Sequence, residues 1–573
     1  MPGPSADPPA PEAGSASPHA AHDRLHTPAR GFLLRSAVVI AFATIASRVL
    51  GLGRETAITT LIGSDYHSDA LYMAMVLPEI IRYLILSGVL SVIFIPLFAE
   101  LASERGLEKA KLAAGQFLTL SLIAGIALSV IGSLLAPQII WLTTLVSPPR
   151  PEQNPQLIPL SIELTRLMFP LMIFTGVSGI MQGILNSLHD YRSPAWAPIW
   201  FNLIFIVGMA LCHQFWPSLV TPQVMCLMMI AGAALQALVQ LGPIARQGVR
   251  WLWPEFSDPM WVRFMRLVPA AFIGYASLVT NNFVDRSFAF GMQEGSNTAL
   301  WLASRVQQLP TAIFTVTLIT ALFPSVAQKL AQQKPAEAMD DFYLALRLCG
   351  LTLLPCMVFL WVWATPIVRV LFNHGKFQDS PDALPLTAQA LAIYGLALFN
   401  TAGMMFTTRL LFAVKDNRTP VILGFLSVPI NYGLDWLFTV PIHLQLGGVA
   451  LSTFFVTGIT FALGLAVLGR HFPVMGSWWR IPATWRVAAL SATYALFGWG
   501  VAQGIEHVWP VVAASNGHTP FWGDVVYLLA AMALSLVFIV GMGALLKMEE
   551  IDVLKRIIAR KRGGGGDALP VEG

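Results

Sequence analysis

Long apolar segments alternate with short polar connections along almost the whole chain. From about Phe32 onward we count about fourteen segments long enough to cross a hydrocarbon core of roughly 30 Å. Their approximate centres are Ala43, Ile85, Ala124, Ile173, Ile204, Ala231, Ile273, Val316, Leu360, Leu396, Leu426, Val456, Leu496 and Leu534. Prolines within several segments are compatible with membrane helices, in which neighbours re-satisfy the freed carbonyls. The pattern predicts an all-α polytopic membrane protein.

The two ends of the chain lack this pattern. Residues 1–29 are rich in Pro, Ala and Ser, which is typical of a disordered tail, and no apolar run follows a basic start there, as a signal peptide would require. Residues 549–573 form a basic tail. If the N-terminus is cytoplasmic, the basic loops fall on the cytoplasmic side, with Arg150 and Lys376 as exceptions. The positive-inside rule therefore predicts that both termini are cytoplasmic.

Composition agrees with this class and excludes others. Only 12% of the 573 residues are charged, against roughly 25% in soluble domains. A net charge of +4 is too weak to indicate nucleic-acid binding. We find no phosphate-binding loop, zinc-ligand spacing or nucleophile elbow, so we expect a secondary transporter without a cofactor rather than an enzyme. The four cysteines lie in apolar runs and are interpreted as packing residues: Cys212, Cys226, Cys349 and Cys356.

The stretch from Ser47 to Pro96 carries charges within otherwise apolar sequence. These charged residues are Arg48, Arg54, Glu55, Asp69, Glu79 and Arg82. An ionisable side chain at membrane depth costs about 2.5 to 3.5 kcal/mol on insertion scales, so it usually faces a protein interior or a water-filled cavity. Each residue alone is also compatible with a helix end or a loop. Arg48 and Arg82 have long apolar runs on both sides, however, which favours a polar cavity.

Further arginines recur in later apolar segments, at Arg166, Arg286, Arg305 and Arg409. Arginine stays charged and forms paired hydrogen bonds with oxyanions, so a ring of arginines suits phosphate better than a cationic drug. The cargo expected from this pattern is an anion with a hydrophobic appendage. For Arg166 and Arg409, an ion pair with Glu163 or a helix-end anchor is an equally good interpretation. We interpret His189 and His374 as polar loop residues.

The chain also shows signs of an internal repeat. The second apolar segment ends in IFIPLFAEL and the eighth in ALFPSVAQKL, each followed by a short amphipathic segment. We therefore expect two lobes of six helices followed by two extra helices, because transporter halves often place their site at the repeat interface. The expected boundaries are 30–250, 251–472 and 473–548. General likeness among polytopic sequences is the alternative explanation.

Five motifs then match one family in order. They are SRVLGLGRE with SDALYMAMVLPEIIRYLILSGVLSVIFIPLFAE, GILNSLHDYRSPAWAPIWFN, NNFVDRSFAFG with LASRVQQLP and ALFPSVA, LFNHGKF, and RLLFAVKDNRTPV. Together they resemble the MurJ (MviN) family, the lipid II flippases of the bacterial cell envelope. The resemblance implies fourteen helices of the multidrug/oligosaccharidyl-lipid/polysaccharide exporter superfamily around a central cationic cavity. It also implies residence in the inner membrane, and a groove at the last two helices for the lipid tail.

The resemblance further implies a cargo and its contacts. Lipid II, an undecaprenyl-pyrophosphate-linked disaccharide pentapeptide, would pass from the inner to the outer leaflet by alternating access. The other expected partners are membrane lipids, with the cell-wall synthesis machinery as a further candidate. The positions that match headgroup-binding residues are Ser47, Arg48, Arg54, Arg82 and Arg305. We assign gating or charge balance to Glu55, Asp69, Glu79, Asp285 and Arg286.

Three positions depart from the family pattern. Ser87, Ser304 and Gln308 stand where relatives often have acids. Their loss predicts a more positive cavity and puts in doubt any gating salt bridge that used those acids. Outward movement of an anion would be favoured by a membrane potential that is negative inside, at about 2.3 kcal/mol per charge per 100 mV.

Other functions stay open at this point. A flippase for another polysaccharide-linked lipid, a cation-coupled drug exporter of the same superfamily and a non-transporting membrane scaffold all have the required hydrophobic pattern. A drug exporter for cations should show unpaired carboxylates in its cavity, and this sequence shows an excess of arginine instead. We interpret the long loop from about Glu506 to Trp522 as an interfacial segment, because tryptophan is favoured at membrane surfaces, and contact with a periplasmic partner is the alternative.

Overall fold

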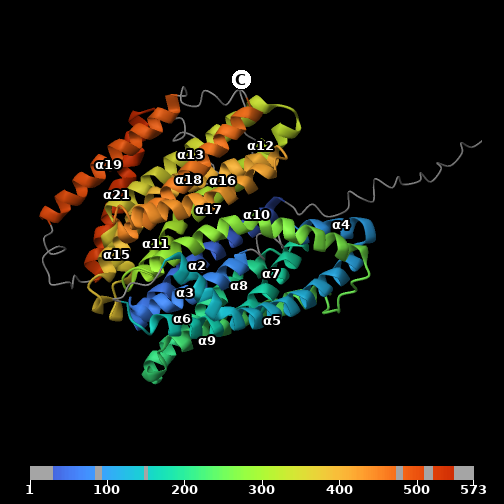
Figure 1. Ribbon diagram of the computed structural model, residues 1–573. Helices are drawn as coiled ribbons and strands as arrows, with labels where there is room; N and C mark the ends of the chain where they lie inside the picture. The colour runs from blue at the N-terminus through green and yellow to red at the C-terminus, as the bar shows by residue number, and fades with distance from the viewer. Residues whose placement is uncertain (1–29, 84–92, 148–152, 473–481, 509–520, 548–573) are drawn as a thin grey trace, which may run out of the picture.

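The computed structural model describes residues 30–83, 93–147, 153–472, 482–508 and 521–547, and every regular element in these ranges is helical. Both predicted tails, Ser87 and most of the loop around Trp509 lie outside the described residues. The helices form one bundle whose axes run roughly side by side (Figure 1). The predicted all-α class is confirmed.

The N-terminal half of the bundle comprises helices α2 to α9. Their bounds are α2 (Arg30–Ile62), α3 (Tyr66–Tyr83), α4 (Ile95–Arg105), α5 (Leu107–Val146), α6 (Leu157–Met168), α7 (Leu171–Ser187), α8 (Arg192–Phe215) and α9 (Pro222–Arg246). Within this half α2 packs on α8, α8 on α9, and α7 on both α5 and α9. These helices occupy the lower part of the bundle in Figure 1.

The C-terminal half comprises helices α10 to α18. Their bounds are α10 (Pro259–Phe290), α11 (Ser296–Pro310), α12 (Val316–Ala331), α13 (Pro335–Val362), α14 (Ala364–Phe372), α15 (Ala383–Leu396), α16 (Leu398–Ala413), α17 (Arg418–Thr439) and α18 (Gln445–His471). A single π-helical turn, Thr311–Thr315, joins α11 to α12. Within this half α17 packs on α10 and α18, and α11 packs on α15.

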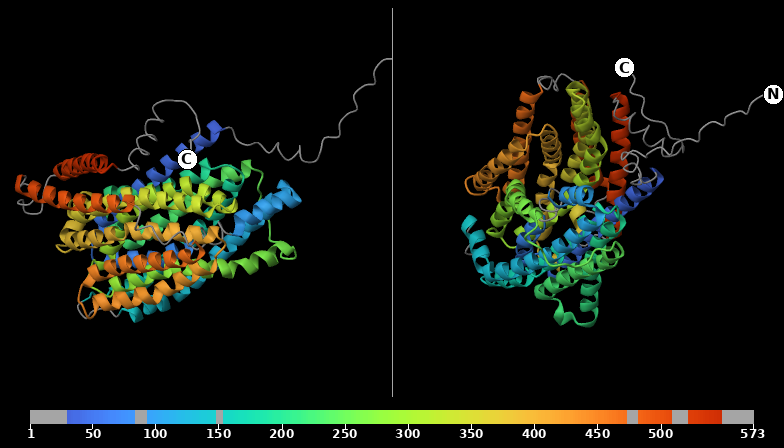
Figure 2. Two further views of the ribbon diagram at one scale, coloured as in Figure 1. Left: turned by 90° about the horizontal axis from the view of Figure 1, so that it is seen from above. Right: turned by 90° about the vertical axis from the view of Figure 1, so that its right-hand side faces the viewer.

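Two further helices, α19 (Pro482–Val508) and α21 (Phe521–Leu545), lie at one edge of the bundle (Figures 1 and 2). Polar contacts attach α21 to α14. Arg369 pairs with the buried Asp524 at 3.3 Å, and the indole of Trp363 donates a hydrogen bond to the hydroxyl of Tyr527 at 3.1 Å. The position of α21 against the bundle is therefore defined by side-chain chemistry as well as by apolar packing.

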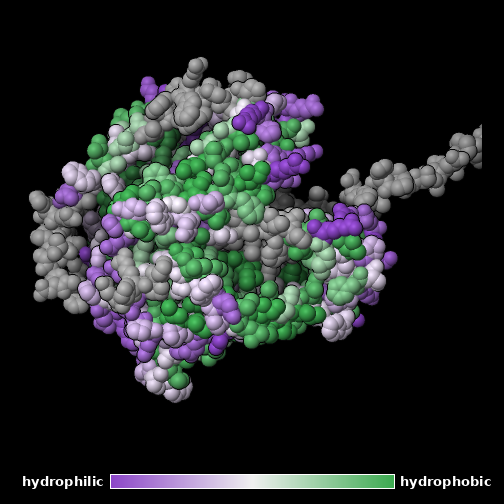
Figure 3. Space-filling model, in the orientation of Figure 1, coloured by the Kyte–Doolittle hydropathy of each residue, from purple (hydrophilic) through white to green (hydrophobic). Residues whose placement is uncertain are grey.

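The described helices have the length and hydropathy of membrane spans. Eight of them qualify individually, and the bent pairs α6 with α7 and α15 with α16 raise the number to as many as ten. Helix α2 has 33 residues and carries Arg48, Arg54 and Glu55 in its second half. Hydrophobic side chains cover much of the flank shown in Figure 3, and strongly hydrophilic ones gather toward its ends. A polytopic bundle is thus confirmed, and the total of about fourteen spans stays a prediction.

One turn is built twice, once in each half. Between α7 and α8, the carboxylate of Asp190 accepts hydrogen bonds from two backbone N–H groups and from the hydroxyl of Ser193, at 2.7 to 3.2 Å. Between α16 and α17, Asp416 accepts the equivalent bonds, including one from Thr419 at 2.6 Å. The bonds from Thr419 lower the pKa of Asp416. The sequences DYRSP and DNRTP therefore form the same turn with the same hydrogen bonds, and the predicted internal repeat stays a prediction.

Candidate functional site

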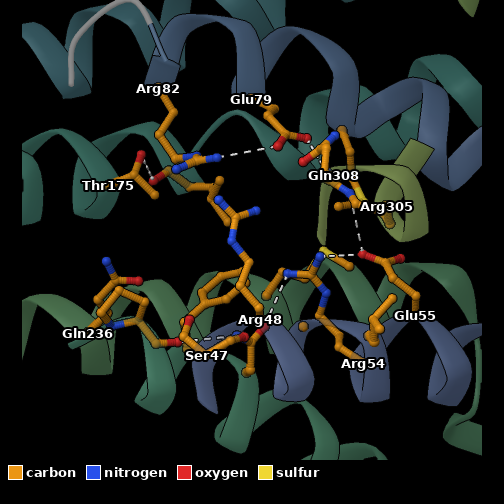
Figure 4. A pocket seen from close by; sticks show the side chains of 18 of the residues that line it. Ser47, Arg48, Arg54, Glu55, Glu79, Arg82, Thr175, Gln236, Arg305 and Gln308 are labelled. Atoms are coloured by element: carbon orange, nitrogen blue, oxygen red, sulfur yellow. Dashed lines mark hydrogen bonds and ion pairs between the residues drawn. The ribbon is translucent and has the colours of Figure 1, made fainter. Parts of the chain in front are cut away.

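A cavity of about 490 Å³ lies among helices of the N-terminal half and α11 of the C-terminal half (Figure 4). All five residues predicted to bind the headgroup line it, together with two of the four predicted carboxylates: Ser47, Arg48, Arg54, Arg82, Arg305, Glu55 and Glu79. Residues that are up to 258 positions apart in the chain thus meet in one place. The polar cavity expected from the charged stretch is present.

Helix periodicity explains how α2 contributes most to this lining. Its lining residues are Ser47, Arg48, Gly51, Leu52, Arg54 and Glu55, which follow the three-to-four-residue spacing of one helix face. Apolar residues on the other face, such as Phe42, Ile45 and Val49, are exposed on the flank of the bundle. The sequence of α2 therefore directs its charges inward and its apolar side chains toward lipid.

The two carboxylates of the cavity are both paired with arginines. Glu79 on α3 accepts a hydrogen bond from Arg305 at 2.6 Å and pairs with Arg82 at 3.3 Å. Glu55 pairs with Arg54 at 2.5 Å and lies 3.9 Å from Nε of Arg305. The guanidinium of Arg305 also lies over the ring of Trp301, 4.3 Å from its centroid, a cation–π contact. A salt bridge between the halves thus exists without acids at positions 304 and 308.

Arg48 differs from the other arginines of the cavity. Among the described residues its guanidinium forms no ion pair, and it points into the middle of the cavity between Arg82 and Arg54 (Figure 4). The lining as a whole holds four arginines against two carboxylates. Such an excess of positive charge, which nothing in the described chain neutralises, makes the electrostatic potential in the cavity more favourable for an anion than for a cation.

Asp69 does not line this cavity, contrary to the polar cluster expected from the charged stretch. It is buried, and its carboxylate accepts hydrogen bonds from the backbone N–H groups of Gly295 at 2.7 Å and Thr298 at 2.8 Å, and from the hydroxyl of Thr298 at 2.7 Å. These donors form the first turn of α11, where unsatisfied N–H groups and the helix dipole favour a negative charge. Asp69 therefore caps a helix of the opposite half.

Close backbone contacts accompany this cap at the same face of the molecule. Gly63, at the end of α2, has a φ of +86°, and a Cβ there would lie 3.1 Å from the carbonyl oxygen of Lys376. Gly375 has a φ of +53°, and a Cβ there would lie 2.5 Å from the carbonyl oxygen of Thr60. Only glycine permits both the backbone angles and the approach. The two halves are thus tightly apposed beside Asp69, which closes the cavity on that side.

Asp285 and Arg286 also lie outside the cavity. Arg286 is buried and donates hydrogen bonds to the carbonyl of Asn297 at 3.2 Å and to the hydroxyl of Ser304 at 2.9 Å. Ser304, one of the departures from the family pattern, is therefore engaged by Arg286 and not by Arg305. The assignment of Arg286 to charge balance in the cavity is not supported by these contacts, which tie α10 to α11.

Asp285 belongs to a second buried polar cluster, between α10, α17 and α18. It accepts a hydrogen bond from Asn431 at 2.5 Å and one from Thr453 at 3.3 Å, and Asn431 also reaches Asp435 at 3.3 Å. Carboxylate, amide and hydroxyl oxygens are the ligands that hard cations prefer. No group of three or more His, Cys, Asp or Glu side chains that could hold a metal ion lies together in the described residues, and this cluster has only two carboxylates.

Sequence reasoning missed the uncharged polar residues of the cavity. The lining includes Thr175, Gln182, Gln236 and Asn202, and Asn202 accepts a hydrogen bond from Arg54 at 3.4 Å. The available signal was an amide within an apolar run, as in IWFNL and AALQALVQ. The arginines Arg166 and Arg409, by contrast, are exposed and do not line the cavity, and Glu163 accepts a hydrogen bond from Gln223 instead.

Comparisons with known proteins agree on one family. A family model described as lipid II flippase MurJ matches residues 58–515. A probable lipid II flippase MurJ from Rhizobium tropici is 26% identical, and the alignment covers 94% of this chain and 99% of that protein. The lipid II flippase MurJ of Burkholderia cenocepacia is 29% identical over 68% of this chain and 75% of its own.

Solved structures share the fold. A lipid II flippase MurJ in an inward closed conformation superposes with a TM-score of 0.69 at 21% identity, covering 91% of this chain and all of that one. An inward-facing MATE family multidrug resistance transporter of the MOP superfamily gives 0.61 at 15% identity, covering 78% and 99%. The superfamily fold expected from the sequence motifs is thereby confirmed. Its families are transporters rather than enzymes, as the absence of catalytic motifs predicted, and this chain belongs to the MurJ family of lipid II flippases.

Proposed function

We propose that this protein moves lipid II across the bacterial inner membrane and that the four cavity arginines bind its pyrophosphate. The observation that carries the proposal is the unpaired guanidinium of Arg48 in a cavity whose two carboxylates are already paired. The planar fork of arginine forms paired hydrogen bonds with phosphate oxygens, which a compact ammonium group does not. Membership of the MurJ family supports lipid II as the cargo.

The positions of the contacts support alternating access. The cavity lies toward the C-terminal ends of α3 and α11, and the apposed face lies at their N-terminal ends, beside Asp69. With both termini in the cytoplasm, as the basic loops favour, the cavity faces the cytoplasm and Asp69 belongs to the outer gate. Loading would then occur from the inner leaflet, with residues 30–250 and 251–472 as the moving lobes and the helices of 473–548 beside the lipid tail.

A membrane potential is the proposed driving force for outward transport. The described chain carries no nucleotide-binding loop, and an anion gains about 2.3 kcal/mol per charge per 100 mV when it moves out of a negative interior. In proteoliposomes with a fixed pH gradient, dissipating an inside-negative potential of 100 mV should therefore slow lipid II export by at least tenfold. Unchanged export after dissipation would rule out voltage as the driving force.

The cavity argues against a cation-coupled drug exporter as the alternative. Such a protein would need a carboxylate available to the cation, and here Glu55 and Glu79 are both paired with arginine. A second alternative, a flippase for another polysaccharide-linked lipid, would need the same cationic cavity. Only identification of the cargo distinguishes that alternative from the proposed function.

Replacement of Arg48 tests the cargo and the cavity together. In cells depleted of their own lipid II flippase, the parent chain should restore lipid-linked precursor at the outer leaflet, measured by its cleavage with an externally added enzyme. Arg48→Ala, at matched membrane levels, should fail to do so. Arg166→Ala removes an exposed arginine outside the cavity and should rescue as the parent does.

The outcomes separate the two parts of the proposal. Failure of the parent while precursor accumulates inside would show that the cargo is another lipid. Full rescue by Arg48→Ala would remove the arginine cavity from the mechanism and would favour a scaffold role for this site.

A further inference from the structure

The wall of the cavity that faces away from Arg305 carries amides instead of charges. Gln182 on α7 and Gln236 on α9 both line the cavity, and Figure 4 shows Gln236 on the opposite side from Arg305. Behind them lies Ser178, which is fully buried at the contact of α7 with α9. The polar side chains that α7 and α9 contribute to the lining, Thr175, Gln182 and Gln236, are therefore all uncharged.

These amides share a single hydroxyl. The oxygen of Ser178 accepts hydrogen bonds from Nε2 of Gln182 at 3.2 Å, of Gln236 at 3.1 Å and of Gln240 at 2.7 Å. A hydroxyl oxygen has two lone pairs, so three donors exceed what it can satisfy at full strength. Gln240 is fully buried, and its Oε1 has no hydrogen-bond partner among the described residues. The cluster thus has more hydrogen-bond donors and acceptors than are needed to hold α7 against α9.

The two amides that line the cavity keep most of their hydrogen-bonding groups available to a ligand. With one N–H directed at Ser178, the side chains of Gln182 and Gln236 each retain a carbonyl acceptor and a second N–H donor. An amide that offers donor and acceptor side by side is complementary to hydroxyl and amide groups. A pyrophosphate only accepts hydrogen bonds, so it can pair with the N–H donor of the amide but leaves the carbonyl acceptor without a partner.

The depth of this wall matches that of the free arginine. Gln236 lies 14 residues from Pro222, where α9 begins, and Arg48 lies 14 residues from Ile62, where α2 ends at the apposed face. At 1.5 Å per residue both positions are about 21 Å along their helices from those ends. Because Arg48 and Gln236 also line the same cavity, a ligand whose phosphate binds Arg48 can present its neighbouring group to Gln236.

We infer that Gln182 and Gln236 form a subsite for the uncharged part of the headgroup, the sugar adjoining the pyrophosphate. This inference rests on the proposed function, because it requires the phosphate to bind the arginines. The subsite distinguishes a glycosylated polyprenyl pyrophosphate from the bare lipid. Ser178 acts as a positioning residue because it accepts hydrogen bonds from both lining amides, and Gln240 in turn donates to Ser178; neither lines the cavity.

Binding of two lipids to the purified full-length protein tests the subsite. The probes are lipid II and undecaprenyl pyrophosphate, which share the tail and the pyrophosphate and differ in the sugar and peptide. Gln182→Leu with Gln236→Leu should weaken binding of lipid II about tenfold and change binding of undecaprenyl pyrophosphate less than twofold. Arg48→Ala should weaken binding of both lipids. Gln328→Leu, which changes an exposed glutamine of α12 outside the cavity, should alter neither.

A single substitution that leaves the hydrogen bonds between α7 and α9 intact tests whether the loss of binding comes only from a weakened helix contact. Gln182 bonds to Ser178 on its own helix, so Gln182→Leu alone leaves the α7–α9 bonds intact and should weaken only lipid II, by about threefold. An equal loss for both lipids, or no loss for either, would show that the glutamines only hold the helices together and would overturn the inference. If the parent binds neither lipid, the proposed function fails first, and the subsite fails with it.

Discussion

Replacement of Asp69 by asparagine should open the apposed face of the protein. The substitution keeps the size of the side chain and removes its charge. In the structure the two carboxylate oxygens accept three hydrogen bonds from the first turn of α11, at 2.7 to 2.8 Å. In Asp69→Asn one of these oxygens becomes an NH₂ group, which then faces an N–H donor. Both the charge and one contact between the halves are lost.

The magnitude follows from the contacts that change. Losing a hydrogen bond to a charged group costs about 1.5 to 3 kcal/mol. The interaction of a carboxylate with a helix N-terminus contributes about 0.3 to 1 kcal/mol more, since Asp69 lies directly at the first turn. Together these terms weaken the closed state by about 3 kcal/mol. The ratio of closed to open molecules should therefore fall about 100-fold.

Labelling from outside the cell measures this ratio. Ser47→Cys places a thiol in the cavity, and a membrane-impermeant maleimide added to the outer face reacts with it only when that face is open. Asp69→Asn should raise the labelling rate by up to about 100-fold over the same protein with Asp69 intact. The protein without Ser47→Cys gives the background from native cysteines.

A neighbouring acid provides the matched control. Asp65 directly precedes α3, the helix that carries Asp69. Its carboxylate accepts hydrogen bonds from His67 and does not contact α11. Asp65→Asn should therefore leave the labelling rate unchanged. If Asp69→Asn raises labelling less than twofold at equal membrane levels, or if Asp65→Asn raises it equally, the helix cap does not hold the face closed.

Two more predictions concern other turns of the chain. Gly375→Ala, whose Cβ would meet the carbonyl of Thr60 at 2.5 Å, should weaken the same closed face by about 1 to 3 kcal/mol and raise labelling of Ser47→Cys. Gly106→Ala has a similar positive φ with nothing within 4 Å and should have no effect on labelling. Asp416→Ala should lower the free energy of unfolding by about 1 kcal/mol at neutral pH, as loss of a helix cap does. Because the folded pKa of Asp416 lies below its ordinary 3.8, this contribution is present above that pH and is lost as the pH falls through the folded pKa. Denaturation in detergent at pH 7 and at pH 3 should show the difference shrinking in acid, and equal differences would contradict the assignment.

The charged part of the site could be predicted because charge is rare in membrane helices. Arg48, Arg54 and Arg82 stand out in apolar runs where an ionisable group is costly. Their placement along α2 and α3 then follows from helix periodicity alone. The same logic singled out Asp69 and Asp285, but it could not say that each belongs to a different polar cluster from the cavity.

Partners across the chain lay beyond sequence reasoning. Arg305 and Glu79 are 226 residues apart, and no local pattern relates an arginine in α11 to a carboxylate in α3. The cap of α11 by Asp69 could not be predicted from the sequence either. The N–H groups that donate to Asp69 belong to the backbone, so no particular residue type marks them. Uncharged residues such as Gln236 were overlooked because an amide costs far less in an apolar helix than a charge does.

The departures at Ser304 and Gln308 show why charge balance has to be judged in the folded cavity. Absence of acids beside Arg305 suggested that a gating salt bridge was lost, because neighbours on a helix are the obvious partners for an arginine. In the bundle Arg305 reaches Glu79 on α3 and lies near Glu55 on α2. Two carboxylates from the N-terminal half thus balance the charge of Arg305, which has no acidic partner on its own helix. Since a cavity sums the charges of all the helices around it, the motif of one helix determines neither the pairing of its arginine nor the charge that remains for the cargo. Arg48 carries part of this remaining charge, because Glu55 on its own helix pairs with Arg54 and Arg305 and not with Arg48.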